Sequence, residues 1–278
     1  MTYIQSGQTL CKLRDAHFDA GRIPDYADIN IQQLYLLRYV YAYAFEYKYM
    51  YQHLLESLPR FNTIEVTSIG CGSMVDYWAL SRVVSNSCTI DYQGIDTIQW
   101  FYQFPSRPRD SVAYYRANAI DFLEHESLSS DIYIFPKSIS EFSLNEVIQI
   151  SECFSAKSIL KDKIHFLFSL RTDQGSMSRD TQKTQILYKR LVKCGFYTTD
   201  ASDTHYEFGV DVREKNIHSV DTDFKLPHTT IDCLKELYSY CPEFYQCIYQ
   251  QGCQSRLGRY PILKCKYAAW QTFSFERR

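Results

Sequence analysis

The sequence predicts an α/β protein with a doubly wound, mostly parallel sheet, N-terminal helices and an insert before the last strand. A β-rich run at 62–69 breaks at Gly70 and Gly72 and then resumes as a helical pattern. After it, short apolar runs alternate with helical ones. Strands that alternate with helices in this way form βαβ units, which build parallel sheets with right-handed crossovers.

The composition is that of an ordinary globular protein. The chain has 278 residues, 45% of them hydrophobic, and a net charge of -2. It can therefore bury a large core, and no overall charge draws it to nucleic acid or to anionic membranes. The first residues lack the basic and apolar regions of a secretory signal, and no run approaches the roughly 18 apolar residues of a membrane span. We expect a cytoplasmic protein without a membrane partner or a strong nucleic-acid signal.

The elements follow in order along the chain. Residues 31–58 place apolar side chains near one stripe without Gly or Pro, which predicts one or two helices before the first strand. The predicted strands lie at 63–69, 88–96, 111–116, 131–135 and 163–170, with a closing pair at 205–210 and 263–275. The predicted helices lie at 75–84, 97–104, 144–160 and 179–193, with a short helix or turn after Ala117.

Ligands of a doubly wound sheet bind beyond the carboxyl ends of its strands, so the residues that follow each strand are the candidates for a site. Gly70 and Gly72 lack a Cβ, which lets a ligand approach the backbone next to a helix N-terminus. Asp96 ends the second strand, where a carboxylate can accept both hydroxyls of a ribose. The other candidates at this edge are Cys71, Ser73, Asn118, Ala119, Phe135, Pro136, Lys137, Ser138, Arg171 and Asp173.

Four motifs in this order resemble the class I, Rossmann-like, S-adenosylmethionine-dependent methyltransferases. They are Ile-Gly-Cys-Gly at 69–72, Gly-Ile-Asp at 94–96, Asn-Ala-Ile-Asp-Phe at 118–122 and Asp-Ile-Tyr-Ile-Phe-Pro-Lys at 131–137. The resemblance covers about 61–209 and the final strand. It implies the Rossmann-like methyltransferase fold and S-adenosylmethionine as the cofactor.

The resemblance also implies roles for individual residues. Gly70 and Gly72 would line the methionine and ribose part of the cofactor, with Cys71 and Ser73 in the same turn. Asp96 would bind the ribose hydroxyls. The remaining cofactor residues would be Thr97 and Ile98 on the adenine face, Asn118 and Ala119 at the adenine edge, and Phe135 and Pro136 after the fourth strand.

The first motif departs from the family pattern at two places. Ser68 stands where the family usually has an acid, and Met74 where it usually has a third glycine. Asp76 is either a compensating acid or an ordinary carboxylate at a helix N-terminus. A dinucleotide is the rival cofactor, but its G-x-G-x-x-G/A fingerprint would need a small residue where Val75 stands.

Methyl transfer needs chiefly positioning and, for some acceptors, one base. Lys137 and Glu141 are the candidate catalytic residues in the loop after the fourth strand. In the ordinary alternative Lys137 is solvated and Glu141 lies in the first turn of a helix. The candidate substrate residues are Tyr26, Arg38, Ser138, Arg171 and Asp173; the last two could equally form a surface ion pair.

Four domains or segments are predicted: an N-terminal helical cap at 1–60, a Rossmann-like cofactor-binding core at 61–209, a cysteine-bearing insert at 210–262, and the final strand at 263–278. Cys241, Cys247, Cys253 and Cys265 lack the C-x2–4-C spacing of zinc knuckles, so we expect no metal, although a metal or cluster stays open.

The sequence thus predicts an S-adenosylmethionine-dependent methyltransferase that acts on a protein, an RNA or a small molecule. The alternative is a catalytically inactive methyltransferase-like protein that works in binding or assembly. Ser68 and Met74 motivate that alternative.

Overall fold

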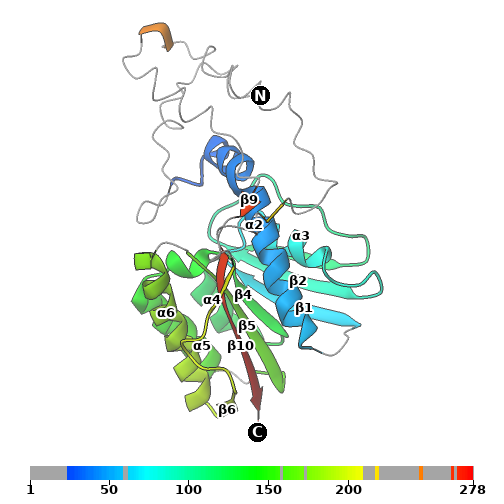
Figure 1. Ribbon diagram of the computed structural model, residues 1–278, viewed down its shortest axis with the longest axis vertical. Helices are drawn as coiled ribbons and strands as arrows, with labels where there is room; N and C mark the ends of the chain where they lie inside the picture. The colour runs from blue at the N-terminus through cyan, green and yellow to red at the C-terminus, as the bar shows by residue number, and fades with distance from the viewer. Residues whose placement is uncertain are drawn as a thin grey trace. The chain divides into compact units, whose positions relative to one another are not determined.

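The computed structural model of the chain is shown in Figure 1. It describes residues 24–58, 62–156, 159–171, 174–208, 217–218, 244–246, 264–265 and 268–277. The chain forms two compact units, one of residues 1–42 with 218–264 and the other of residues 43–217 with 265–278. In the described residues, no helix is both long and apolar enough to cross a membrane.

The second unit is built on one large sheet with strand order β3-β2-β1-β4-β5-β10-β6, in which β7 also pairs with β10. Its strands are β1 Thr63–Ile69, β2 Thr89–Asp96, β3 Ser111–Arg116, β4 Ile132–Phe135, β5 Lys163–Leu170, β6 Phe196–Tyr197, β7 Tyr206–Phe208 and β10 Ala268–Arg277. The pairs from β3 to β5 are parallel, and β10 runs antiparallel to its neighbours β5, β6 and β7. This confirms the predicted doubly wound, mostly parallel sheet and its closing strands. A separate two-stranded sheet pairs β8 Ile217–His218 with β9 Lys264–Cys265.

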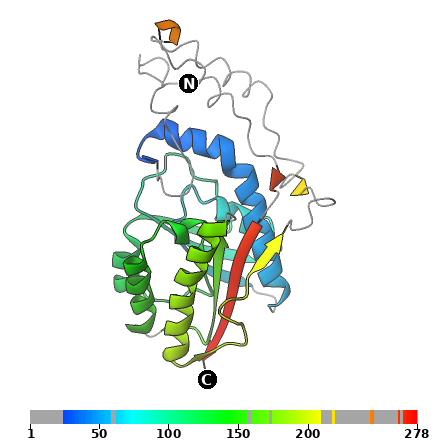
Figure 2. The same cartoon turned by 60° about the vertical axis from the view of Figure 1, so that its left-hand side comes forward.

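Helices cover both faces of the large sheet (Figures 1 and 2). The helices are α2 Ile29–Glu56, α3 Val75–Ser81, α4 Ala119–His125, α5 Leu144–Ala156 and α6 Gln174–Lys193, with short 3-10 turns η2 Ser138–Ser140 and η4 Phe244–Gln246. Side chains alternate between the two faces of a strand. Ile69, Phe135 and Phe168 therefore join the core under α4, α5 and α6, while Ser68, Tyr92 and Ser169 point to the face of α3 and the 43–56 part of α2.

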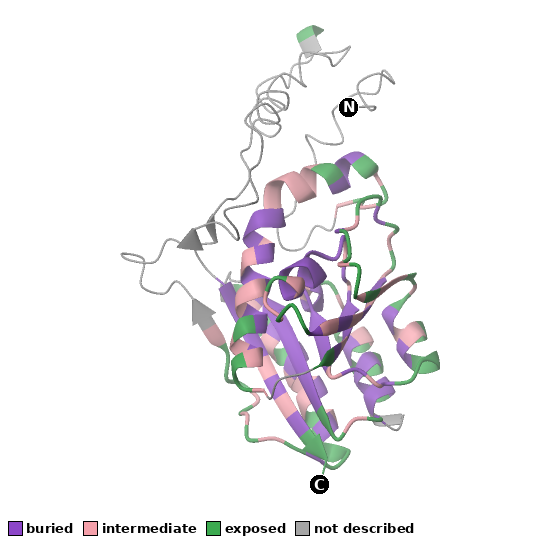
Figure 3. Cartoon of the chain, turned by 90° about the vertical axis from the view of Figure 1, so that its right-hand side faces the viewer, coloured by how far each residue is buried: buried purple, intermediate pink, exposed green. Residues whose placement is uncertain are grey.

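The central strands β1, β4, β5 and β10 are mostly buried, as the purple arrows of Figure 3 show, whereas no residue of the edge strand β3 is buried. On the α4–α6 face, the core is rich in aromatic rings, with Phe166 stacked on Phe168 and on Tyr133. A parallel sheet that is buried on both faces explains why β4 and β5 read as continuous apolar runs.

The predicted helix at 97–104 is wrong. No regular helix or strand forms between β2 and β3, and the chain returns along α3 in an irregular path. In a helix, Trp100 and Phe104 would share one face, whereas here Trp100 lies against Gly72 and Phe104 against Trp78. Burial of the two rings at separate places overrides the helical pattern. Other boundaries differ less: α3 ends at Ser81, and α6 begins at Gln174 rather than at Arg179.

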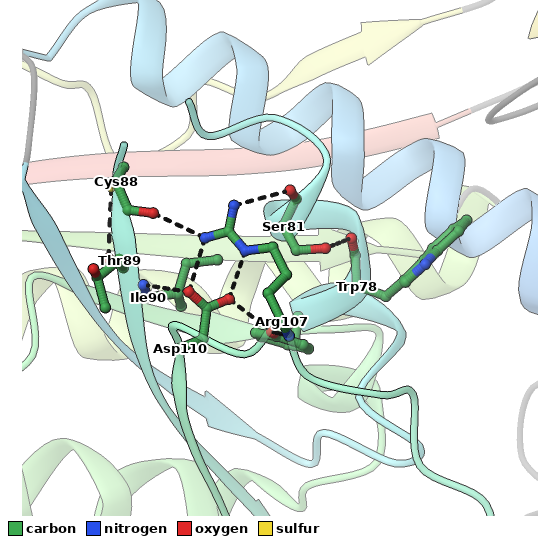
Figure 4. Close-up of polar contacts among 8 residues, drawn as sticks. Trp78, Ser81, Cys88, Thr89, Ile90, Arg107 and Asp110 are labelled. Atoms are coloured by element: carbon green, nitrogen blue, oxygen red, sulfur yellow. Dashed lines mark hydrogen bonds and ion pairs between the residues drawn. The ribbon is translucent and has the colours of Figure 1, made fainter. Parts of the chain in front are cut away.

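The far end of this crossover is anchored by an ion pair at the amino edge of the sheet (Figure 4). Arg107 Nε donates to Asp110 Oδ2 at 2.7 Å, and its Nη2 donates to Asp110 Oδ1 at 2.8 Å and to the Cys88 carbonyl at 2.9 Å. Asp110 also accepts the Tyr77 hydroxyl and the Ile90 backbone N–H. The Asp110 side chain is fully buried, and its negative charge is paired with the positive charge of Arg107.

Candidate functional site

The glycine turn after β1 is fastened to the end of β2. Gly70 and Gly72 have positive φ values of 73° and 56°, and Met74 follows in the left-handed region with φ 63°. The backbone N–H groups of Gly70 and Cys71 both donate to the Ile95 carbonyl, at 2.8 and 3.1 Å. The turn needs glycine because ordinary side chains are strained at such φ values.

Gly70 also lets two strand ends pack together. A Cβ added to it would lie 2.4 Å from the Cβ of Ser138, which is far inside contact distance. Ser138 is buried and its hydroxyl donates to the Ile69 carbonyl. The predicted substrate residue Ser138 is therefore engaged within the protein, and one function of Gly70 is packing.

Asp96 lies next to the glycine turn, as predicted. Its Oδ2 accepts the Gly72 N–H at 2.8 Å and its Oδ1 accepts the Ile98 N–H at 2.9 Å. Burial raises the pKa of Asp96, although these two N–H groups oppose the rise. Thr97 beside it is exposed and Ile98 is half-buried. Each carboxylate oxygen can accept more than one hydrogen bond, so Asp96 keeps capacity for a further donor.

Trp100 belongs to this site and was not predicted. Its ring lies 3.5 Å from the position that a Gly72 Cβ would take, and the residue is only 6% exposed. The indole also favours the ionised form of Asp96 and so lowers its pKa. The contact of Trp100 with Gly72 could not be predicted, because a helix at 97–104 would place Trp100 on the same face as Phe104.

Asn118 and Ala119 lie at the carboxyl end of β3, beside that of β2. The Ala117 N–H donates to the Asp96 carbonyl at 2.9 Å, which joins the two strand ends. Asn118 is exposed and caps α4, because its Oδ1 accepts the Ile120 N–H at 2.8 Å. Ala119 is buried in the core cluster. With Oδ1 used by the cap, Asn118 is arranged to offer its amide N–H groups outward.

Asp76 lies in the first turn of α3, as in the ordinary alternative. It is fully buried, and the Tyr92 hydroxyl donates to both of its oxygens at 3.0 Å. Burial raises its pKa to about 6, while the hydroxyls of Ser68 and Tyr92 pull it down. The side chains of Ser68 and Asp76 are thus neighbours.

Four of the predicted cofactor residues are buried. Phe135 is fully buried and stacks on Phe168 at 5.0 Å, which leaves it no surface for a ligand. Pro136 is buried as well. Cys71 and Ser73 in the glycine turn are likewise buried, at 5% and 2% exposure. These four predicted cofactor residues shape the site from beneath.

Lys137 is held by an internal ion pair rather than solvated. Its Nζ lies 2.7 Å from Glu46 Oε1 on α2, and it also donates to the Leu170 carbonyl. Ser169 donates to the same Glu46 oxygen. Lys137 has φ 61°, a left-handed value that is rare outside glycine and typical of constrained sites. The partner residue Glu46 lies 91 positions earlier, so no local pattern could have revealed it.

Glu141 and Arg171 meet at the same rim. Arg171 Nη2 lies 3.9 Å from Glu141 Oε1. Partial burial raises the pKa of Glu141 to about 7, the charge of Arg171 lowers it, and the charge of Asp96 raises it further. The Glu141 side chain keeps 41% of its surface exposed. A carboxyl with a pKa near neutrality and access to solvent is suited to acid–base catalysis.

The remaining predicted residues stay predictions. Tyr26 and Arg38 belong to the other compact unit. Asp173 and three of the four insert cysteines, Cys241, Cys247 and Cys253, lie outside the described residues, and only the strand position of Cys265 is described. Among the described residues, no group of three or more His, Cys, Asp or Glu could hold a metal ion.

No protein-family model and no curated protein matches this sequence. Several solved structures are similar. They include the [4+2]-cyclase SpnF, with 11% identity over 83% of this chain and 81% of that chain and a TM-score of 0.40. A cyclopropane-fatty-acyl-phospholipid synthase-like protein from Lactobacillus casei ATCC 334 has 14% identity over 84% and 92%, with a TM-score of 0.43.

A third similar structure is Haemonchus contortus phosphoethanolamine N-methyltransferase 2 in complex with phosphomonomethylethanolamine and S-adenosylhomocysteine. It has 12% identity over 91% of this chain and 61% of that chain, with a TM-score of 0.37. Likenesses this distant assign no activity, which has to be inferred from the chain's own residues.

Proposed function

We propose that the protein is an S-adenosylmethionine-dependent methyltransferase. The observation that carries the proposal is the junction of the glycine turn with Asp96, where Gly72 donates to Asp96 Oδ2 at 2.8 Å beyond the ends of two adjacent parallel strands. Ligands of a doubly wound sheet bind at this edge, on either side of the strand at which the order reverses. Here that strand is β1.

The residues at this edge fit the adenosyl part of such a cofactor. Asp96 would accept the ribose hydroxyls, and the exposed Thr97 and half-buried Ile98 would lie on the adenine face. Asn118, whose Oδ1 is used in capping α4, would donate its amide N–H to a ring nitrogen of adenine. The bound cofactor would supply an activated methyl group to the acceptor.

Glu141 is the residue we propose as the base. Its carboxyl lies at the rim beside Arg171 and is accessible to solvent, and its raised pKa of about 7 makes it an acceptor of protons at neutral pH. Lys137 is bound to Glu46 and to a backbone carbonyl, so we assign it a positioning role for the loop after β4. Arg171 would orient the acceptor.

A dinucleotide suits the sheet less well. The six-stranded dinucleotide-binding order is 3-2-1-4-5-6, all parallel, whereas here the antiparallel β10 enters between β5 and β6. Val75, at the place of the third fingerprint glycine, is buried against the sheet. Both observations favour S-adenosylmethionine over NAD.

The second candidate function is a methyltransferase-like protein that binds or assembles without catalysis. The observation that favours it is that both Asp96 oxygens already accept backbone N–H groups while Trp100 covers Gly72. The acceptor class, whether protein, RNA or small molecule, and a cytoplasmic location stay predictions of the sequence.

Binding of S-adenosylhomocysteine by calorimetry tests the cofactor assignment. We expect wild-type protein to bind and Asp96→Ala to bind at least 100-fold more weakly. Asp121→Ala on α4 is the matched control, since Asp121 is also an acid near the edge but is exposed. Equal binding by Asp96→Ala and wild type would refute the ribose assignment.

Transfer of a labelled methyl group to fractions of cell protein, RNA and metabolites tests catalysis. Label in one fraction would identify the acceptor class and reject the inactive alternative. Cofactor binding without label in any fraction would favour that alternative.

A further inference from the structure

The crossover between β2 and β3 covers the face of the glycine turn. The Trp100 ring lies against Gly72, with Cζ2 3.5 Å and Nε1 3.9 Å from the position of an added Cβ. One residue later in the turn, the Ser73 carbonyl accepts the Phe104 N–H at 3.1 Å. Residues 97–104 therefore contact the turn at two successive positions.

The same segment surrounds Asp96. The Ile98 N–H and the Gly72 N–H occupy one oxygen each, at 2.9 and 2.8 Å, and the Trp100 indole acts on the same carboxylate. The indole therefore lies on the part of the glycine turn, at Gly72, that the proposed function assigns to the ribose.

Residues 99–103 form a short strap between two fixed points, because the Ile98 carbonyl accepts the Tyr114 hydroxyl and the Phe104 N–H donates to the Ser73 carbonyl. They form no regular helix or strand, and Phe101 and Tyr102 are 66% and 51% exposed on the outer side. A firm anchor follows the strap, because Arg107 is bound to Asp110 and to the Cys88 carbonyl. Segments with few backbone bonds and exposed side chains open at low free-energy cost.

We propose that Trp100 closes the cofactor site, and that residues 99–103 swing outward, with Thr97 and Ile98 staying in place, so that the ribose takes the place of the indole. This proposal rests on the proposed function. Because only the open form binds, the closed form weakens the apparent affinity by the fraction of molecules that are open. Removal of the indole should therefore tighten binding. If the indole instead stacked on the bound ligand, its removal would weaken binding.

The test is S-adenosylhomocysteine binding to the full chain as wild type, Trp100→Ala and Trp100→Phe. We expect Trp100→Ala to bind at least tenfold more tightly than wild type. Trp100→Phe keeps a ring on Gly72 and should stay within about threefold of wild type. Equal or weaker binding by Trp100→Ala would overturn the closure.

Tryptophan fluorescence gives a readout that does not depend on a folded alanine variant. In wild type, ligand should increase acrylamide quenching of a tryptophan signal that Trp100→Phe lacks and Trp270→Phe retains, since Trp270 lies in β10. An unchanged, shielded Trp100 in a protein that binds the ligand would overturn the closure and leave the proposed function standing. No binding by any variant would overturn the proposed function, and the closure with it.

Discussion

Buried acids near the two edges of the main sheet have pKa values shifted in opposite directions. At the amino edge, Asp110 is buried, but Arg107, Tyr77 and the Ile90 N–H all donate to it. Burial alone would raise its pKa, but the bonds from Arg107, the Ile90 N–H and Tyr77, together with the charge of Arg107, lower the pKa of Asp110 overall. Toward the carboxyl edge, Asp76 and Asp96 are bonded by hydroxyl and N–H groups, and burial raises the pKa of both.

We relate this difference in pKa to function: the amino-edge cluster around Asp110 is structural, and the carboxyl edge holds the proposed site. A buried acid with a bidentate arginine is stable as it stands and binds nothing further. Acids whose pKa burial has raised hold charge that a cationic or hydrogen-bonding ligand can stabilise, and such groups gather at functional sites. Glu141, with a pKa near 7, belongs to the second kind.

The largest expected effect comes from breaking the amino-edge cluster. Arg107→Ala leaves the fully buried Asp110 carboxylate without its cation, and loss of one partner of a buried pair costs about 3–5 kcal/mol. We expect a loss of about 4 kcal/mol in the free energy of unfolding, measured by urea denaturation at pH 7. Arg109→Ala, an exposed neighbour, should change it by less than about 0.5 kcal/mol. Similar values for both variants would contradict the structural role.

The next effect tests the packing at the carboxyl edge. Gly70→Ala places a Cβ 2.4 Å from that of Ser138 and at φ 73°, so strain and overpacking should together cost about 3 kcal/mol. Thermal and urea unfolding measure it. Gly175→Ala is the control, because it has open space and lies in α6, where alanine should add up to about 1 kcal/mol. A stable Gly70→Ala protein would mean that Gly70 is free of Ser138.

The third prediction concerns the chemistry at the rim. If Glu141 is the base, the rate of methyl transfer should rise with pH through about 7 and then level off, because the carboxyl must be ionised to accept a proton. Glu141→Gln should lower the rate by at least 100-fold and leave S-adenosylhomocysteine binding within about twofold. A pH profile in Glu141→Gln like that of wild type would remove Glu141 from the mechanism.

The smallest effect sharpens the comparison of the two buried acids. The pKa of Asp76 is raised to about 6 in the folded protein, so its ionisation opposes folding above that pH and has no effect below about 4. Asp76→Asn should therefore add about 2 kcal/mol of stability at pH 7, and this gain should vanish as the pH falls from 6 to 4. A variant that is less stable than wild type at pH 7 would show that the charge has a partner.

The strands and their ends could be predicted from the sequence because burial on both faces leaves continuous apolar runs. β1 and β5 lie where the pattern placed them, and Asp96 lies beside Gly72 because adjacent parallel strands bring their carboxyl ends together. Contacts set by tertiary packing could not be predicted. The pairing of Lys137 with Glu46 joins distant parts of the sequence, and the burial of Asp76 depends on Tyr92 in another strand.

The error at 97–104 has the same origin. The apolar spacing of Trp100 and Phe104 suits a helix, and nothing local reveals that Gly72 and Trp78 offer each ring a separate place. The missing Cβ of Gly72 is what predicts a ligand at this position. In the structure, the Trp100 indole lies against this position.

The Arg107–Asp110 pair affects the rate at which the crossover opens as well as the stability of the protein. Hydrogen exchange should divide the crossover in two. The amides of Gln99 and Phe101 should exchange through local opening, while the Ile90 amide, bonded to Asp110 at 3.0 Å, should exchange only when the unit unfolds. Because the anchor stays closed while the strap opens, each opening begins and ends at the same hinge. The residues between Ile98 and Phe104 then set how often the edge of the sheet is open to a ligand.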